Sequence, residues 1–249
     1  MLALLGWVLT SSSFARYRLL RGSWRPDGAH IRQIFALGLP IGIAIFFEVS
    51  VFSLVALLAS PLGENVVAAH QVSMSVTSLL FMVPLSLAIS MTIRTGQAFG
   101  RHDWAGIRLI RQTGLCMTTG IACLSALGIT FFRDNITGVY STDPLVRGLA
   151  ASLLLYAAAY QVFDALQVGA AGCLRGVQDT RSPMMLTLIA YWIIAMPIGY
   201  TLAMTDTWTP KPLGASGFWT GLVIGLGVAC VLLNIQLARR LRMLEKRWS

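Results

Sequence analysis

Charge is scarce in this sequence. Only 12% of the 249 residues are Asp, Glu, Lys or Arg, and only 10 are acidic. Soluble domains carry about 25% charged residues, so this scarcity argues against a soluble protein. The chain is instead 56% hydrophobic, with a mean hydropathy of +0.71. Because about 20 apolar residues cover a hydrocarbon core of roughly 30 Å, its long apolar runs predict a membrane protein.

Motifs of catalytic and metal chemistry are also missing. The four cysteines form no C-x-x-C pair, none of the three histidines stands in an H-E-x-x-H motif, and no G-x-x-x-x-G-K-[ST] loop occurs. The stretch "GASG" at 214–217 matches the G-x-S-G of rhomboid proteases, but no histidine follows Ser216 to act as its base. The sequence therefore predicts a protein that is not an enzyme and has no resident cofactor.

Six continuous apolar runs predict an all-α integral membrane protein, because barrel strands would alternate in polarity. We expect 34–237 to form one six-helix lobe. We expect 1–33 to hold the end of a preceding helix, whose beginning is missing, and a basic cytoplasmic linker. The segment 238–249 is expected to be a basic cytoplasmic tail. The six predicted spans are 34–60, 67–93, 109–131, 147–174, 184–205 and 214–237.

The net charge of +9 is unevenly distributed along the chain. Arginines concentrate in 16–32, 94–108 and 239–247, whereas the loops 61–66 and 206–212 hold one Lys between them. Basic segments stay in the cytoplasm, so this alternation places both ends there, with anionic lipid as their neighbour. A nucleic-acid partner is not expected.

Two carboxyl groups lie deep within predicted spans, where a charge costs about 2.5–3.5 kcal/mol. Glu48 and Asp164 each fall about halfway along a span, and we expect no Lys or Arg at comparable depth. Tyr160 lies one turn before Asp164. Such carboxyls usually line a pathway, so we expect them to exchange a proton or a metal cation. The alternative is a pair of protonated carboxyls hydrogen-bonded within the bundle.

Amide, hydroxyl and aromatic side chains share helix faces with these carboxyls, since residues three or four apart are neighbours on a helix. Such a lining suits a small cation held by oxygens and an organic cation held over aromatic rings. Ordinary interhelical packing is the alternative for each residue taken singly. The predicted cavity-lining residues are Gln71, Phe52, Ser75, Phe81, Gln161 and Gln167.

Four stretches carry a family resemblance: "GLPIGIAIFFEVSVFSLVALLASPLG", "VAAHQVSMSVTSLLFMVPLSLA", "YQVFDALQVGAAGCLRGVQDTRSP" and "GASGFWTGLVIGL". They resemble the multidrug and toxic compound extrusion (MATE) transporters, in particular the NorM-like branch. The resemblance covers nearly the whole chain. It implies a fold of twelve helices in two six-helix lobes, of which this chain would be the C-terminal one.

The resemblance also implies a function, a cation-coupled multidrug efflux antiporter of the bacterial inner membrane. Glu48, Asp164 and Tyr160 match the family's coupling-cation residues, and Gln71 matches a residue of the cleft. Sodium is favoured over protons as the coupling ion, organic-cation drugs or dyes are the expected substrates, and an N-terminal six-helix lobe is the expected partner. The alternatives are an exporter of lipid-linked sugars and a membrane fragment that does not transport.

Overall fold

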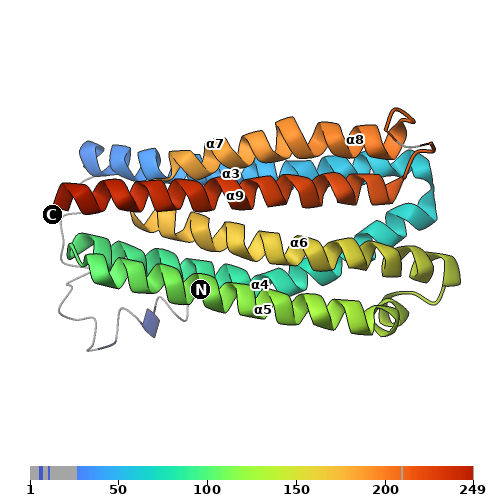
Figure 1. The fold of residues 1–249 in the computed structure, drawn as a ribbon, viewed down its shortest axis with the longest axis horizontal. Coiled ribbons are helices and arrows are strands. Elements are labelled where there is room, and N and C mark those ends of the chain that lie inside the picture. The colour runs from blue at the N-terminus through green and yellow to red at the C-terminus, as the bar shows by residue number, and fades with distance from the viewer. Residues whose placement is uncertain (1–5, 8–10, 12–26, 209, 249) are drawn as a thin grey trace. The chain divides into compact units, whose positions relative to one another are not determined.

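The computed structural model describes residues 6, 7, 11, 27–208 and 210–248, and the regular elements among them are helical. The chain divides into two units, Met1–Ala36 and Leu37–Ser249. Figure 1 labels the elements, which are α3 (Gly28–Ala59), the 3₁₀-helix η1 (Ser60–Leu62), α4 (Glu64–Gly100), α5 (Trp104–Tyr140), α6 (Pro144–Gly176), α7 (Arg181–Leu188), the π-helix η2 (Ile189–Ala195), α8 (Met196–Met204) and α9 (Ala215–Trp248).

Among the described residues, six helical stretches are long and apolar enough to cross a membrane, which confirms the prediction of six spans. The fifth, Arg181–Met204, is built from α7, η2 and α8 in succession. The sequence predicted one span here, over 184–205, with an interruption at Pro197, and it did not predict the π-helical segment that precedes this proline. Pro197 follows the segment closely, and its missing N–H removes one helical hydrogen bond. A π-helical segment is one way for a helix to accommodate such a break.

The helices are longer than the predicted spans. The third was predicted over 109–131, whereas α5 runs from Trp104 to Tyr140. Residues 238–248, predicted as a tail, continue α9 as helix. Apolar windows locate only the part of a helix inside hydrocarbon, while good helix formers such as Leu, Arg, Glu and Lys extend it beyond. Most of 1–33 lies outside the described residues.

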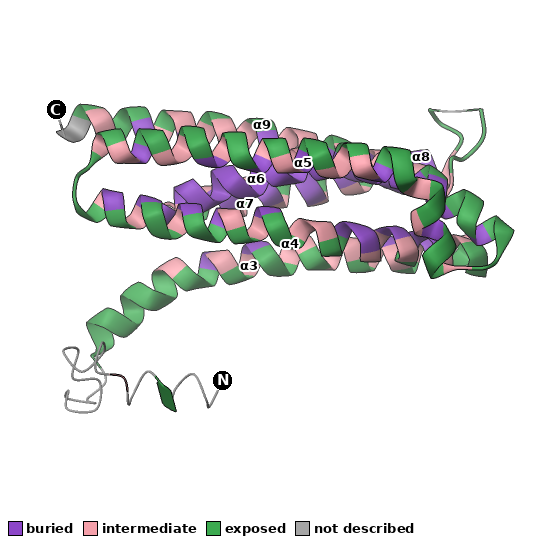
Figure 2. Cartoon of the chain, turned by 90° about the horizontal axis from the view of Figure 1, so that it is seen from below, coloured by how far each residue is buried: buried purple, intermediate pink, exposed green. Residues whose placement is uncertain are grey.

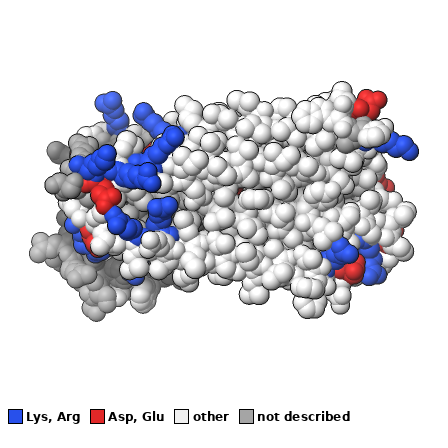
Figure 3. All heavy atoms as spheres, viewed as in Figure 1, with Lys and Arg blue, Asp and Glu red and all other residues white. Residues whose placement is uncertain are grey.

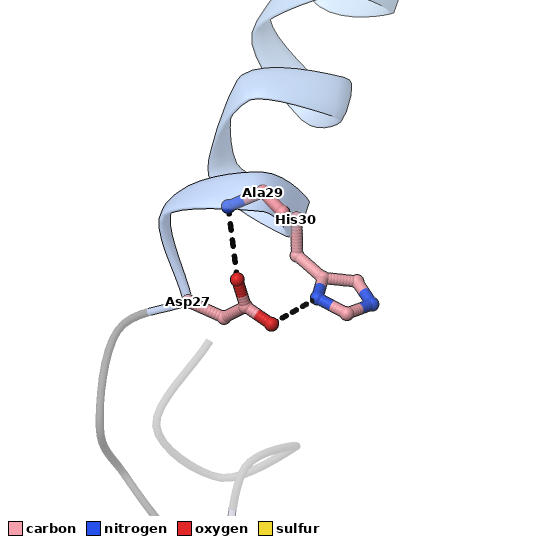
Figure 4. A network of polar contacts seen from close by, with 3 residues as sticks. All are labelled: Asp27, Ala29 and His30. Carbon is pink, nitrogen blue, oxygen red and sulfur yellow. Dashed lines mark hydrogen bonds and ion pairs between the residues drawn. The ribbon is translucent and has the colours of Figure 1, made fainter.

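The first turn of α3 belongs to the first unit and has a side-chain cap. The backbone N–H of Ala29 donates to Oδ1 of Asp27 at 2.9 Å, and Nδ1 of His30 lies 2.7 Å from Oδ2 (Figure 4). These bonds, that from His30 above all, lower the pKa of the Asp27 carboxyl. Asp27 therefore caps the helix N-terminus in its ionised form.

Helix α6 is the most buried helix of the second unit and packs against α4, α5 and α9 (Figure 2). Its small residues let neighbours approach closely. The hydroxyl of Thr92 on α4 donates to the carbonyl oxygen of Gly172 at 3.0 Å. A Cβ atom on Gly172 or Gly176 would overlap α4. Because α6 is central, polar side chains in its middle, such as Gln161, Asp164 and Gln167, are buried inside the helical bundle.

The sequence places Gly217, Gly221 and Gly225 at four-residue spacing on α9, which predicts a close contact with another helix, and α8 and α9 do approach closely there. A Cβ on Gly217 would overlap the backbone of Ala203, and one on Gly221 would overlap Gly199. On the face drawn in Figure 3, charged side chains gather toward the helix ends and leave a wide uncharged band between. That distribution is expected of helices whose middles lie in hydrocarbon.

Candidate functional site

A cavity of about 320 Å³ lies between α3, α4 and α6. Glu48 of α3 and Asp164 of α6 both line it, as does Tyr160, one turn before Asp164. The structure therefore brings together the three residues predicted to bind a coupling cation. The other lining residues are Ile45, Val49, Phe52, Met74, Thr77, Ser78, Phe81, Leu85, Val168 and Arg175.

Large aromatic side chains separate α3 from its neighbours beside this cavity. The rings of Phe52 and Tyr160 meet edge to face at 6.0 Å, and those of Phe47 and Trp192 at 6.1 Å. Nε1 of Trp192 also donates to the carbonyl oxygen of Phe47 at 3.3 Å. Because aromatic rings rather than small residues mediate these contacts, the backbone of α3 stays apart from the backbones of α6 and η2.

Asp164 is deeply buried, with 2% of its surface exposed. Its Oδ1 has no hydrogen-bond partner among the described residues, and neither do Nε2 and Oε1 of Gln161. Buried polar atoms without partners are rare and costly, because each loses its bonds to water. An oxygen atom in this condition can accept a bond from a cation or a protonated ligand that enters the cavity.

Arg175 lines the same cavity and corrects the expectation that no cation lies near the two carboxyls. It stands eleven residues after Asp164 on α6, about 16 Å along the helix axis. Long side chains on a helix point back toward its N-terminus, which brings the guanidinium toward Asp164. No ion pair joins Arg175 to Glu48 or Asp164 in the part of the chain that the structure describes.

A second cavity, of about 380 Å³, lies beside the first between α3 and α4. Phe52, Met74 and Ser78 line both cavities, so the two share a wall. The predicted lining residues Gln71 and Ser75 face this second cavity. Phe52 and Phe81, also predicted, line the first one.

Gln161 and Gln167 line neither of these two cavities, although both are buried. Gln167 is engaged elsewhere, because its Nε2 lies 2.8 Å from the hydroxyl of Tyr191. Helical spacing put both glutamines near Asp164, but it does not say which side of a broad helix face opens into a cavity.

His70 and Trp219 were not among the residues predicted from the sequence to belong to the site. Nε1 of Trp219 donates to Nδ1 of His70 at 3.2 Å. The Trp219 ring also lies 6.3 Å from Tyr160, which itself contacts Phe52. His70 lines the second cavity and Tyr160 the first, so these rings connect the two. The signal in the sequence was a His and a Trp inside predicted spans.

The same contact bears on the protease alternative. Nδ1 of His70 accepts from Trp219, and no hydrogen bond between His70 and Ser216 occurs among the described residues. A serine nucleophile needs its base within hydrogen-bond reach.

The donor set of the first cavity consists of oxygens. Among the described residues no group of three or more His, Cys, Asp or Glu side chains is placed to hold a metal ion. Two carboxyls and a phenol suit a proton or a hard monovalent cation better than a soft transition metal. Their ionised forms would also attract an organic cation.

Known proteins resemble this chain in sequence over nearly all its length. A family model described as MatE matches residues 40–201. The chain is 52% identical over 209 residues to the probable multidrug resistance protein NorM of Acinetobacter baylyi, a match covering 84% of the chain and 45% of that protein. It is 46% identical over 242 residues to the multidrug resistance protein PmpM of Pseudomonas aeruginosa, covering 97% and 50%. The chain thus spans about half the length of the curated relatives it matches.

Solved structures share the fold. The eukaryotic MATE transporter AtDTX14 superposes with a TM-score of 0.84 at 21% identity, over 100% of this chain and 56% of that one. An outward-facing multidrug resistance MATE family transporter superposes with a TM-score of 0.77 at 22% identity, over 98% and 55%. The expectation of a transporter family rather than an enzyme family is confirmed. The chain belongs to the MATE family, in its NorM-like branch, and its six-helix fold corresponds to half of a MATE transporter.

Proposed function

We propose that this chain is the C-terminal lobe of a cation-coupled multidrug efflux antiporter. The observation that carries the proposal is the shared cavity of Glu48 and Asp164, in which an oxygen of a deeply buried carboxyl lacks a hydrogen-bond partner among the described residues. Intramembrane carboxyls are costly and typically mark ion pathways. The relatives named as multidrug resistance proteins also support a function in multidrug efflux.

In this proposal Glu48, Asp164 and the hydroxyl of Tyr160 bind the coupling ion. Sodium is the favoured ion, because hard cations prefer oxygen ligands and because the NorM-like resemblance implies it. One sodium ion and the guanidinium of Arg175 together balance the two carboxylates, and release of the ion leaves one unbalanced negative charge in the cavity. In this proposal the coupling ion and the transported drug favour different conformations of the protein. Movement of the ion down its gradient then drives a rocking of the two lobes.

The substrates in this proposal are organic-cation drugs or dyes. Phe52 and Phe81 present aromatic faces to the first cavity, and such faces attract a desolvated cation. Gln71 and Ser75 supply polar atoms in the adjoining cavity. Coupling ion and drug would compete for the same negative charge, which is what antiport requires.

Arg175 gives the alternative of a lipid-linked-sugar exporter its one specific support, since a guanidinium can bind a phosphate. Two carboxyls face that single guanidinium in the cavity. Their combined charge favours a cationic substrate, so the multidrug exporter is the preferred function.

The proposal includes a location and a partner. We place the chain in the bacterial inner membrane as a multi-pass protein with both ends cytoplasmic, because its arginines concentrate on one side. Residues 1–33 would hold the end of a preceding helix and the basic linker to an N-terminal six-helix lobe, and 34–237 would form the second lobe. The end of α9 would project its basic residues at the cytoplasmic surface.

Efflux of a fluorescent organic cation from cells tests this function. The chain is expressed alone and together with an N-terminal lobe of a NorM-like relative, with an inward sodium gradient imposed and then removed. We expect sodium-dependent efflux from the paired lobes only. Glu48→Gln and Asp164→Asn should each abolish the coupled efflux while leaving membrane insertion intact.

Asp134→Asn is the matched control, because it removes a carboxyl whose side chain is 76% exposed and lies outside the cavity. It should leave efflux unchanged. Full efflux in both the Glu48 and Asp164 variants would overturn the site. Inserted paired lobes that move no cation under any gradient would overturn the function.

A further inference from the structure

A third cavity, of about 270 Å³, lies between the beginning of α5 and the end of α9. It shares no lining residue with the two cavities described above. Its lining residues are Trp104, Arg108, Arg111, Gln112, Ala238, Leu241, Arg242 and Glu245.

Three arginines face one glutamate in this cavity. The glutamate is already engaged, because an oxygen of Glu245 accepts from Nη2 of Arg108 in an ion pair that links α9 to α5. Arg111 and Arg242 have no ion-pair partner in the described parts of the chain. The cavity thus has two guanidinium groups that form no ion pair with a carboxylate of the described residues.

Apolar surface adjoins these charges. Leu241 of α9 lines the cavity and is buried, while Leu109 and Met243, next in sequence to the lining residues Arg108 and Arg242, are 60% and 54% exposed. Exposed aliphatic side chains beside arginines are expected where hydrocarbon meets headgroups, and Trp104 is a residue type enriched at that boundary. A soluble anion would make no contact with exposed apolar side chains such as Leu109 and Met243, whereas a lipid would place its acyl chains against them.

We propose that this cavity binds the phosphate group of an anionic phospholipid, with Arg111 and Arg242 as its ligands. A planar guanidinium forms paired hydrogen bonds with phosphate oxygens, and one arginine from each helix would clamp the group between α5 and α9. The bound lipid would join two helices that the Arg108–Glu245 ion pair already links. The proposal is independent of the transport function.

Lipid titration of the purified full chain in a neutral detergent tests the site. The probes are short-chain phosphatidylglycerol, short-chain phosphatidylcholine and inorganic phosphate, with bound ligand counted by native mass spectrometry. We expect phosphatidylglycerol to bind at least about tenfold more tightly than either of the others. Arg111→Gln combined with Arg242→Gln should weaken phosphatidylglycerol binding about 30-fold, since each basic residue near anionic lipid contributes about a fivefold factor.

The matched control combines Arg94→Gln with Arg239→Gln. These exposed arginines lie in the basic segments 94–108 and 239–247 but do not line the cavity, so the pair removes equal charge away from the site and should change affinity much less than the cavity pair does. Glu245→Gln should strengthen binding, because it removes the negative charge from the cavity. The variant that combines Arg111→Lys with Arg242→Lys should retain part of the affinity for phosphatidylglycerol. It replaces the glutamine pair in the test if that pair fails to fold.

Three results would overturn the proposal. Equal losses in the cavity and control pairs would mean that general surface charge binds the lipid. Equal binding of inorganic phosphate would mean a site for soluble anions. Equal binding of phosphatidylcholine would mean that the acyl chains, and not the anionic headgroup, determine the binding affinity.

Discussion

Nε2 of Gln167 on α6 donates to the hydroxyl oxygen of Tyr191 at 2.8 Å, a hydrogen bond between α6 and the π-helical segment η2. Both side chains are buried, Gln167 at 4% and Tyr191 at 1% exposure. Gln167 follows Asp164 by three residues, so this bond lies within one turn of the acidic cavity. It ties the irregular segment to the central helix.

Tyr191→Phe should lower the free energy of unfolding by about 1–3 kcal/mol, because the ring packing remains while the buried amide of Gln167 loses its partner. SDS titration of the chain in mixed micelles measures the change. Tyr200→Phe is the matched control, since Tyr200 lies in the same span at 45% exposure. Equal stability of the Tyr191 variant and the unaltered chain would show that the bond contributes nothing.

Arg175→Gln should strengthen sodium binding at Glu48 and Asp164 roughly tenfold, because removing a like charge from the same cavity relieves a repulsion on the order of 1–2 kcal/mol. Isothermal titration of the purified chain with sodium chloride, against choline chloride, measures the affinity. Arg181→Gln removes an exposed arginine that does not line the cavity and should change little. Weaker sodium binding in the Arg175 variant would show that the guanidinium organises the carboxyls instead of competing with the ion.

Gly221→Ala should destabilise the chain by about 1–3 kcal/mol, because its methyl group would overlap the backbone of Gly199 and force α8 and α9 apart. Gly227→Ala on the same helix is the control. No atom lies within 4 Å of the added methyl group there, so a gain of about 0.5–1 kcal/mol is expected from helix propensity. The same SDS titration compares them, and a Gly221 variant as stable as the Gly227 variant would contradict the close approach.

Acidification should open the first turn of α3. The hydrogen bonds from His30 and Ala29 lower the pKa of Asp27 from its usual 3.8, so their stabilisation is present above that value and is lost as pH falls through the lowered pKa. The cap should therefore hold at neutral pH and be lost only at a pH below the ordinary pKa of an aspartate. Hydrogen exchange at the amide of Ala29, corrected for its intrinsic pH dependence, reports the loss.

Two variants separate the cap from other acid effects. Asp27→Ala should leave the Ala29 amide unprotected at every pH, since alanine cannot accept its hydrogen bond. Asp27→Asn keeps an acceptor that does not titrate, so its protection should be independent of pH. Acid-dependent exchange in the Asn variant would place the titrating group elsewhere.

The sequence predicted the helical class, the number of spans and the mid-span positions of Glu48 and Asp164, because each follows from local properties. Span number follows from apolar runs of bilayer length, and a carboxyl in the middle of such a run is at depth in any packing of helices. The glycine spacing on α9 predicted a close helix contact for a similar reason, since four-residue spacing puts small residues on one face. Helix ends were missed because a helix continues past the hydrocarbon that reveals it, as α9 does to Trp248.

Other features were decided only by tertiary structure. Arg175 looked like a loop residue near the end of a span, yet its long side chain reaches the cavity of Glu48, because helix geometry directs it back toward Asp164. Gln161 and Gln167 shared a face with Asp164 in the sequence pattern, but their neighbours come from other helices, and the pattern does not name them. Trp219 and His70 stand 149 positions apart and meet through one hydrogen bond. By itself the sequence determined which residues are buried in the membrane, through local hydrophobicity; which of them face one another depends on how the helices pack, and only the tertiary structure decided that.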